Sequence, residues 1–522
     1  MTNLITPSFR INTSEQFKEA FSEASPTRMY MFVGRITPYS NDQVATATSN
    51  TLTATTFDVY KDMVALKRIN TTDIISIAPR YNWTTGTVYT QYDDSVTNLF
   101  DKQFYVLTSD NNVYKCIDNN RGAASTVEPT GTSTSIITTS DGYRWKFLYT
   151  VTTADAQKFL TTTYIPVREV TANNGSAQWS VQQAAANGSI EHIVITSNGA
   201  GYISTSNTFL TITNSSIVHL SNNALQVDGA YIGSTIYISS GLGSGQLRRI
   251  IRYTGVGRSV TVNSAFSVTP NTSSRYIIAP AVIVSGEGGS HTAVRTTAYV
   301  SNSLGGQIRK ITILTNGRNY GYANVSIIAN STYGSGASAR PVISPRNGHG
   351  SKARDELNAK DVMMSISVSG GESNTFPTNN DFRTIGVIRD PILRSGSAAN
   401  SSVIDQCHRI VIQNVTGDYT ADEVVTGGTS GVKGRVVYFA NTNAARTKGI
   451  LRVIRVTTDG IGRGFSQTET LTAASSGVTA SVINVVKSAI REYTGDVLYI
   501  ENNLPVSRRT DQVEEFRFVV TF

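Results

Sequence analysis

The sequence predicts a mainly β protein in which a discontinuous α+β core domain carries two insertions that resemble β-sandwiches or β-barrels. Long Thr-, Ser-, Asn- and Gly-rich segments alternate apolar and polar residues, as strands with one buried face do. Residues 346–393 interrupt them with a charged, Ala-containing composition. The chain has 522 residues, which is more than one hydrophobic core usually spans.

These differences in composition divide the chain into five segments. Three of them look like parts of one core domain that contains both ends of the sequence: 1–170, 346–395 and 489–522. The two β-rich segments, 171–345 and 396–488, would leave this domain and rejoin it at nearby points. Such insertions cost little entropy, because the cost of loop closure grows slowly with length.

The first segment begins with a predicted amphipathic helix. Thr13 and Gln16 form a capping-box pattern, and the helix would end at Pro26. An apolar strand is expected at 29–33. The spacing of Val59, Met63 and Leu66 predicts a second helix. Residues 74–78 would close this region before the break at Pro79.

From Phe104 onward apolar and polar residues alternate with a period of two residues. Strands are expected at 104–107 and 113–117, joined by a Ser-Asp-Asn-Asn turn. A later strand carries four aromatic residues on one face. Such a stripe could stack against sugars, but it is more often a core face, which we favour. The four residues are Tyr143, Trp145, Phe147 and Tyr149.

The segment between the insertions combines a helix-compatible stretch with two strands. Residues 352–364 are charged and contain alanine, and strands are expected at 362–368 and 383–388. Pro391 would end the second strand.

A repeat recurs in both β-rich segments. Residues 188–202 align without a gap with 306–320, and a third copy runs from Gly449 to Phe465. Each copy predicts a strand, a tight turn and a covering aromatic residue, and Asn198-Gly199 and Asn316-Gly317 suit a type I′ turn. A second half-unit, a Gly-rich turn and a strand, is expected at 334–343, 431–437 and 477–483.

The first copy resumes only near Gly286, so we expect residues 217–280 to be an insertion within an insertion. The repeat spacing is too irregular for a β-helix, which favours small sandwich or barrel modules.

The motifs that could carry chemistry fail on spacing, so the sequence predicts no catalytic, cofactor or metal site and no enzyme. Gly348-His-Gly-Ser-Lys352 has the wrong order for a phosphate-binding loop. Glycines 241, 243 and 245 lack dinucleotide-binding context and fit a hairpin turn. Acidic residues could form a glycosidase pair, but nothing places two of them across a cleft. The acids considered are Asp93, Asp94, Glu514 and Glu515.

The histidines and cysteines are also dispersed. No two histidines have the spacing of helical metal ligands, and Cys407 and His408 would point to opposite faces of a strand. We therefore expect structural histidines, at 192, 219, 291, 349 and 408. Cys116 and Cys407 lie far apart in sequence, and a disulfide between them is not expected in a reducing cytoplasm.

Charge and hydropathy limit the partners. The net charge is +8, but the Arg and Lys residues are scattered, and the tightest group is Arg248, Arg249 and Arg252 on an expected strand. Nucleic acid is therefore not an expected partner. No apolar run is long enough to span a bilayer, and the first residues do not resemble a signal peptide, so neither membrane insertion nor secretion is expected.

Four separated motifs stand out along the chain: NGHGSKARDEL followed by NDFRTIGVIRDP within 346–393, the C-terminal residues 495–522, MFVGRITPYSNDQ at 31–43, and DGYRWKFLYTV at 141–151. Together they resemble the gene-eight baseplate wedge protein of contractile-tailed bacteriophages. The resemblance covers roughly 1–170, 346–393 and 490–522, and it does not reach the Gly-rich segments.

The resemblance implies a non-catalytic homodimer that assembles with other wedge proteins and with tail-fibre attachment proteins in the baseplate of the virion, after synthesis in the host cytoplasm. A host-glycan binding or depolymerising tail protein, acting through the β-rich insertions, is the alternative. A nucleic-acid-binding protein is a third class, favoured only by the net charge. We also expect the C-terminal strand, 516–522, to need a partner that covers its alternating apolar residues.

Overall fold

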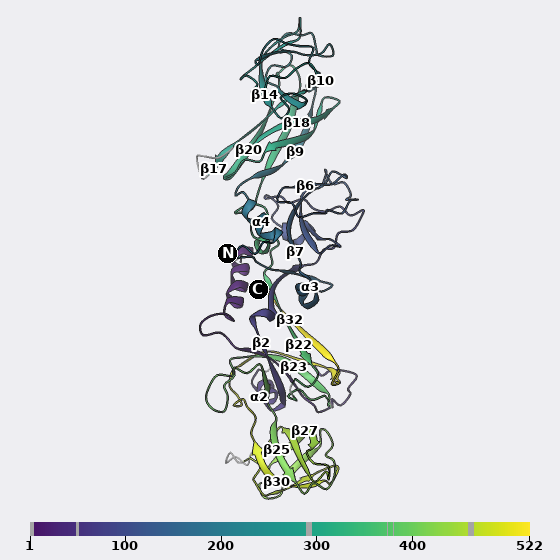
Figure 1. The fold of residues 1–522 in the computed structure, drawn as a ribbon, viewed down its shortest axis with the longest axis vertical. Helices are drawn as coiled ribbons and strands as arrows, with labels where there is room; N and C mark the ends of the chain where they lie inside the picture. Colours follow the sequence, from purple (N-terminus) through teal and green to yellow (C-terminus); the bar gives the residue numbers. More distant parts are fainter. Residues whose placement is uncertain (1–4, 49–51, 289–294, 373, 379, 458–463) are drawn as a thin grey trace. The chain divides into compact units, whose positions relative to one another are not determined.

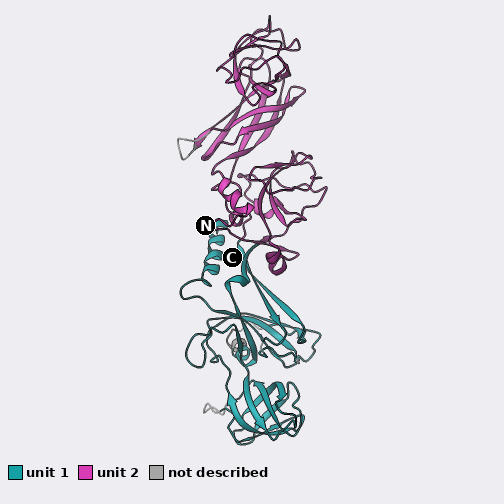
Figure 2. Cartoon of the chain, in the orientation of Figure 1, with its two compact units in different colours: residues 1–77, 360–522 teal, residues 78–359 magenta. Residues whose placement is uncertain are grey.

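The chain forms two compact units, which Figure 2 shows in different colours. Unit 1 comprises residues 1–77 and 360–522, and unit 2 comprises residues 78–359. Strands make up 43% of the chain and helices 9%, which confirms the mainly β prediction (Figure 1). The computed structural model describes residues 5–48, 52–288, 295–372, 374–378, 380–457 and 464–522.

This division differs from the predicted domain boundaries. Both ends of the sequence belong to unit 1, as expected, but residues 78–170 cluster with the first β-rich segment. They share a hydrophobic core with the first part of the segment 346–393, because Phe104 and Leu148 pack in one cluster with Leu357. The composition of these segments therefore did not identify which core each of them joins.

Unit 1 contains two antiparallel sheets around one apolar cluster. The first has the strand order β24-β2-β1-β23-β31, and in the second β22 lies between β32 and β3. Met31 and Val33 from the first sheet pack in the same core as Val362 and Ile366 from the second. The strands are β1 Met29–Gly34, β2 Met63–Ile69, β3 Ile74–Pro79, β22 Asp361–Ser369, β23 Phe382–Arg389, β24 Val403–Asp405, β31 Asp496–Val506 and β32 Val513–Val520.

The helices of unit 1 correct the sequence prediction. Helix α1, Pro7–Glu19, begins at Thr6, whose Oγ1 accepts the N–H of Phe9, so the predicted capping box at Thr13 is wrong. Pro7 at the first helical position favours the earlier start. Helix α2, Leu52–Asp62, stops before Met63, and both 63–69 and 74–79 are strands rather than helix.

The second β-rich segment forms a closed six-stranded barrel in unit 1 (Figure 1). Its interior is apolar, and Ile410, Val425, Leu451 and Leu471 are all fully buried. This confirms the expectation of a small barrel module. The strands are β25 His408–Gln413, β26 Val424–Gly427, β27 Lys433–Asn441, β28 Lys448–Ile454, β29 Thr470–Ala473 and β30 Thr479–Val486.

Unit 2 begins with the predicted aromatic sheet, in the order β4-β5-β7-β6. Tyr143, Trp145, Phe147 and Tyr149 are buried, which confirms the core interpretation of the stripe. The strands are β4 Tyr105–Leu107, β5 Asn112–Asp118, β6 Ile137–Thr138, β7 Arg144–Thr150 and β8 Tyr164–Val167. The helices of this unit are η2 Leu99–Asp101, α3 Thr153–Phe159, α4 Ala177–Ala184 and α5 Ala353–Glu356, and η1 Thr71–Asp73 belongs to unit 1.

The first β-rich segment forms a six-stranded sheet in the order β19-β18-β17-β20-β21-β9. Its edges are linked, because Ile190 N donates to Asn316 O and Tyr202 N donates to Gly306 O, both at 2.9 Å. The sheet is therefore nearly a barrel. The strands are β9 Ile190–Ala200, β17 Ala281–Gly288, β18 Thr297–Leu304, β19 Gln307–Thr315, β20 Tyr320–Ile328 and β21 Ser335–Ile343.

A separate seven-stranded sheet is inserted between β9 and β17, in the order β10-β16-β13-β14-β15-β12-β11. The predicted insertion within an insertion is therefore present, although it starts at Thr205 rather than at residue 217. Its strands are β10 Thr205–Thr208, β11 Thr211–Ile212, β12 Ile217–His219, β13 Thr235–Ser240, β14 Leu247–Thr254, β15 Ser259–Val262 and β16 Arg275–Ala279.

The two six-stranded modules share one topology. Each consists of two halves of three consecutive strands: β9, β17 and β18 with β19 to β21 in unit 2, and β25 to β27 with β28 to β30 in unit 1. In both modules the first strand of each half pairs with the third strand of the other half, and the two second strands pair with each other. Exchanging the halves leaves the strand order unchanged.

The barrel of unit 1 shows this internal symmetry at the level of single side chains. Residues 419–437 align without a gap with 465–483, and each copy carries a glutamate and a Ser-Gly turn. The buried Glu469 accepts the N–H of Ser430 at 2.9 Å and that of Ser466 at 2.5 Å. The buried Glu423 accepts the N–H of Ser476 at 3.0 Å. Each half thus holds the turn of the other half.

The repeat in unit 2 is confirmed as a structural unit, but its turn is not of type I′. Gly199 and Gly317 have φ near +60°, at 60° and 62°, whereas neither preceding Asn has a positive φ. The aromatic residue covers the glycine as predicted. The hydroxyl of Tyr202 accepts the N–H of Ala337, and that of Tyr320 accepts the N–H of Thr296. The turn of the third copy, at 459–460, lies outside the described residues.

The symmetric glutamates generate a stability prediction. Replacing Glu469 by Ala should lower the free energy of unfolding by about 1–3 kcal/mol, because it leaves buried N–H groups without an acceptor. Replacing Glu423 by Ala should have an effect of similar size, since its contacts are equivalent. Chemical denaturation measures both, with the exposed Glu23→Ala as the control. A large loss in one variant and none in the other would contradict the equivalence of the two halves.

Candidate functional site

The two C-terminal strands of unit 1, β31 and β32, which belong to different sheets, present the most distinctive surface. Among the described residues, β31 pairs only with β23, and β32 pairs only with β22, so each has one free edge. The two sheets that end in these strands face each other across the core, and Tyr499 contacts Phe518 with the ring centroids 5.7 Å apart. The sandwich is therefore open on the side of the two free edges.

A mainly apolar groove of about 450 Å³ lies at this opening. Both sheets and helix α1 contribute to it. Leu498 and Tyr499 on β31 are 48% and 44% exposed, and Val519 on β32 is 39% exposed. Its lining includes Phe17, Met29, Met364, Ile385, Val387 and Phe518.

Strand β32 has two faces with different roles. Phe516, Phe518 and Val520 pack against the core of unit 1, so the prediction that these residues need a partner to cover them is wrong. The outward row alternates with them and consists of Val513, Glu515, Arg517 and Val519, of which the outer two are apolar. Glu515 and Arg517 form an ion pair at 2.5 Å.

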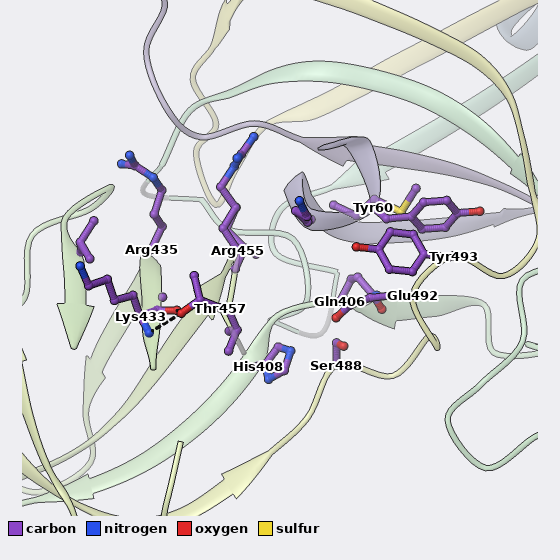
Figure 3. Close-up of a pocket in the computed structure, with 16 residues that line it drawn as sticks. Tyr60, Gln406, His408, Lys433, Arg435, Arg455, Thr457, Ser488, Glu492 and Tyr493 are labelled. Carbon is purple, nitrogen blue, oxygen red and sulfur yellow. Dashed lines mark hydrogen bonds between the residues drawn. The ribbon is translucent and has the colours of Figure 1, made fainter. Parts of the chain in front are cut away.

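A second cavity, of about 540 Å³, lies beside the barrel of unit 1 (Figure 3). The rings of Tyr60 and Tyr493 contact each other at one end, with their centroids 5.6 Å apart, and Lys433 lies at the other end. The lining is mostly polar, and it includes Lys61, His408, Arg435, Arg455, Thr457, Ser488 and Glu492.

Several charges of this cavity are paired with neighbouring residues. Arg455 binds Asp62 through Nε and Nη2, and Arg435 lies 3.2 Å from Asp422. The carboxylate of Glu492 is 3.2 Å from Arg394. Burial, with Arg394 and Lys487 nearby, lowers the pKa of His408 to about 4, so this imidazole is neutral at pH 7.

A buried polar cluster in unit 2 explains the motif at 346–359. The side chains of Lys115 and Glu356 form an ion pair that is almost fully buried, with the ring of Tyr92 4.4 Å from the ammonium group. The N–H of Gly350 donates to Glu356 Oε1 at 2.6 Å. One N–H of the Gly-rich loop therefore binds a carboxylate of its own chain.

The protonation states in this cluster follow from burial and charge. Burial alone would raise the pKa of Glu356, but the charge of Lys115 and the contact with His349 outweigh it and lower the pKa to about 2. Burial and the charge of Lys115 lower the pKa of His349. The cluster thus holds an ionised Glu356 beside a neutral imidazole. Nδ1 of His349 lies 3.7 Å from Glu356 Oε2, beyond hydrogen-bond distance, and has no hydrogen-bond partner among the described residues, so the expectation of a fully satisfied histidine is wrong for this atom.

The remaining histidines and cysteines are separated. His192 lies 3.5 Å from Asp118, His219 contacts Thr213 and a backbone carbonyl, and His291 lies outside the described residues. Cys116 and Cys407 are free and buried, as expected. In the described part of the chain, no group of three or more His, Cys, Asp or Glu residues could hold a metal ion.

Arginines engage all the acids that were weighed as a glycosidase pair. Arg340 binds Asp93 and lies 3.6 Å from Asp94. Glu514 binds Arg508 at 2.8 Å, and Glu515 forms the ion pair with Arg517 on β32. Glycines 241, 243 and 245 all have positive φ and lie between β13 and β14, which confirms the hairpin turn. The structure brings none of these residues together into a catalytic arrangement.

Comparison with known proteins adds no assignment, because no family model and no curated protein matches the chain. None of the described helices is both long enough and apolar enough to cross a bilayer.

The sequence analysis did not predict that β31 and β32 would both have a free edge. Only the strand pairing reveals them, although the alternation within 513–520 was a usable signal.

The buried ion pair leads to a second stability prediction. Glu356→Gln leaves the Lys115 charge buried without its partner, which should lower the free energy of unfolding by about 3–5 kcal/mol at pH 7. Because the folded pKa of Glu356 lies below its ordinary value of 4.5, its contribution is present above that pH and is lost as the pH falls toward 2. Denaturation from pH 7 to pH 3 measures this.

The exposed Glu287→Gln serves as the control for this variant. Combining Glu356→Gln with Lys115→Met should recover much of the stability, since the unpaired charge is then removed. A Glu356→Gln protein as stable as the parent at pH 7 would contradict the proposed role of the pair.

Proposed function

We propose that this protein is a non-catalytic structural subunit of the baseplate of a contractile phage tail. It holds neighbouring wedge proteins, and tail-fibre attachment proteins with them, during host attachment and sheath contraction. It is made in the host cytoplasm and resides in the virion. The four motifs that resemble the gene-eight wedge protein support this role, and the observation that carries it is the pair of free edges at β31 and β32.

Free edges of this length favour assembly. An edge strand offers unpaired N–H and C=O groups to a strand of another chain, and soluble proteins usually shorten or cover such edges. Strand β31 has 11 residues and β32 has 8, and the groove between them is apolar. A partner that pairs with an edge would also cover this groove.

The outward row of β32 is complementary to itself, which supports a homodimer. If β32 pairs antiparallel with β32 of a second copy about Phe516, Glu515 lies opposite Arg517 of that copy, and Val513 lies opposite Val519. Each such cross-strand pair contributes roughly 0.2–1 kcal/mol. Stable obligate interfaces bury upward of roughly 2,000 Å², so the contact would have to extend from the strand over the groove.

A charge-reversal series tests this dimer. Glu515→Arg and Arg517→Glu should each produce monomers, because like charges then face each other across the two-fold axis. The double variant should restore the dimer, since it exchanges the signs. Light scattering during size-exclusion chromatography at micromolar concentration measures the mass, with the exposed Lys102→Glu as the control. Single variants that remain dimeric would contradict this interface.

The baseplate role has its own test. Co-expression with the other wedge proteins of the same phage should yield a stable complex that contains this chain. Truncating Leu498 and Val519 to Ser should weaken that complex if the groove is also used there, because it removes apolar area from the contact. A protein that dimerises but joins no wedge complex would argue against the baseplate and leave the dimer interface standing.

A further inference from the structure

The seven-stranded insertion of unit 2 carries an unusual share of the charge. Residues 203–280 contain five arginines, no lysine and a single acidic residue, Asp228, so they hold half of the chain's net charge of +8. Asp228 accepts the N–H of Gly255 at 2.7 Å. The rest of the segment is rich in Ser, Thr and Asn.

None of these arginines is neutralised by a carboxylate among the residues that the structure describes. Arg248 donates to the carbonyl oxygen of Ala265, and Arg258 donates to that of Ala224, so both remain positively charged without a counter-charge. The side chains of Arg249, Arg252 and Arg275 have no protein partner in the described part of the chain. A compact module with five uncompensated guanidinium groups attracts anions.

Two of the free arginines share one face of β14. Ile250 and Tyr253 on this strand are buried, whereas Arg249 and Arg252 are exposed. The ladder is irregular between Ile250 and Arg252, and the extra residue allows both arginines to face outward although they are three positions apart. Their Cα atoms are then about 10 Å apart, at roughly 3.3 Å per residue.

Hydroxyl-bearing residues lie beside the arginines on β15. Thr261 lies directly opposite Arg252 and is partly exposed, whereas Thr235, opposite Arg249 on β13, is buried and donates to the carbonyl oxygen of Ala279. Ser259 continues the same face of β15, and Asn263 follows it and accepts the N–H of Arg249. The face therefore combines two free guanidinium groups with side chains that exchange hydrogen bonds with sugar hydroxyls.

We propose that this face of the insertion binds an acidic polysaccharide, with Arg249 and Arg252 pairing with its carboxylate or phosphate groups. The planar guanidinium donates two parallel hydrogen bonds to such groups, and the neighbouring hydroxyls bind the uncharged parts of the chain. This binding is separate from the assembly role, because β14 and the edges of β31 and β32 belong to different units. It gives the insertion a surface glycan as its partner.

The same observations disfavour nucleic acid and lipid. Specific and non-specific binding of duplex DNA uses a stripe of basic residues that neutralises several phosphates, and single strands also need exposed aromatic platforms. The outer face of β14 offers two free arginines, and Tyr237 on the neighbouring strand is stacked on Tyr299. An anionic membrane surface is read by clusters of about 4–8 basic residues, which this face lacks.

The test uses the full-length chain and immobilised polymers of known charge. Polygalacturonate presents carboxylates, phosphorylated dextran presents phosphates, and neutral dextran and duplex DNA complete the set. We expect saturable binding to at least one acidic glycan, which weakens as salt is raised, and no binding to neutral dextran. The double variant Arg249→Ser with Arg252→Ser should bind that glycan roughly tenfold more weakly.

A matched control removes the same charge elsewhere in unit 2, at the exposed Lys102 and Arg346. This control should bind the acidic glycan as the parent does. Equal losses in the two double variants would overturn the assigned face and leave only a general effect of net charge. Binding to DNA that equals glycan binding, and that is lost in the Arg249 and Arg252 variant, would overturn the choice of a glycan. Absence of binding to both acidic polymers would overturn the proposal itself.

Discussion

Pairing of backbone hydrogen-bond groups is the constraint on which this structure depends. A chain with so many strands must deal with many sheet edges, and each unpaired edge invites association. The two six-stranded modules leave few unpaired edges, because the first strand of each half pairs with the third strand of the other half. The closing strands therefore come from opposite halves, and neither half could close a sheet alone. Shared polar contacts, such as Glu469 with the turn at Ser430, add to this mutual dependence.

Elsewhere in the described residues the edges are mostly short. Strand β24 has 3 residues, β4 has 3, β6 has 2, β10 has 4 and β11 has 2, so these edges offer few backbone groups to another chain. The two C-terminal strands, β31 and β32, are different, because both are long and free on one side. Since the same chain shortens or closes its other edges, the exception at β31 and β32 is best explained by a partner.

Much of the fold followed from the sequence, because alternation of apolar and polar residues survives in half-buried strands. Prediction failed where a strand is buried on both faces. Val59, Met63 and Leu66 have helical spacing, but 63–69 is a strand whose two faces are covered, and such a strand carries no alternation. The Asn-Gly pairs misled for another reason. Gly199 has a positive φ and lies against the ring of Tyr202 and the backbone of Ala337, but Asn198 before it does not have the positive φ that a type I′ turn needs.

The candidate sites were harder to predict, since they depend on which segments meet. The contact between Lys115 and Glu356 joins positions that composition assigned to the same core, yet nothing in the pattern indicated a buried ion pair. The free edges of β31 and β32 depend on the absence of a neighbouring strand, which no single segment encodes. By contrast, the arginines of β14 were visible in the sequence, but their role could be inferred only from the structure, in which no carboxylate of the described residues pairs with them.

The distribution of charge links these surfaces. Only 16% of the residues are charged, and in the core regions several acids are bound to an arginine, as Asp62 is to Arg455 and Glu514 is to Arg508. The net charge of +8 therefore reflects an excess of positive residues in particular segments. It gathers in the insertion at 203–280, while the outward row of β32 balances Glu515 against Arg517. A balanced row suits a second copy of the same chain, whereas an unbalanced one needs a partner of opposite charge, so the two surfaces call for different partners.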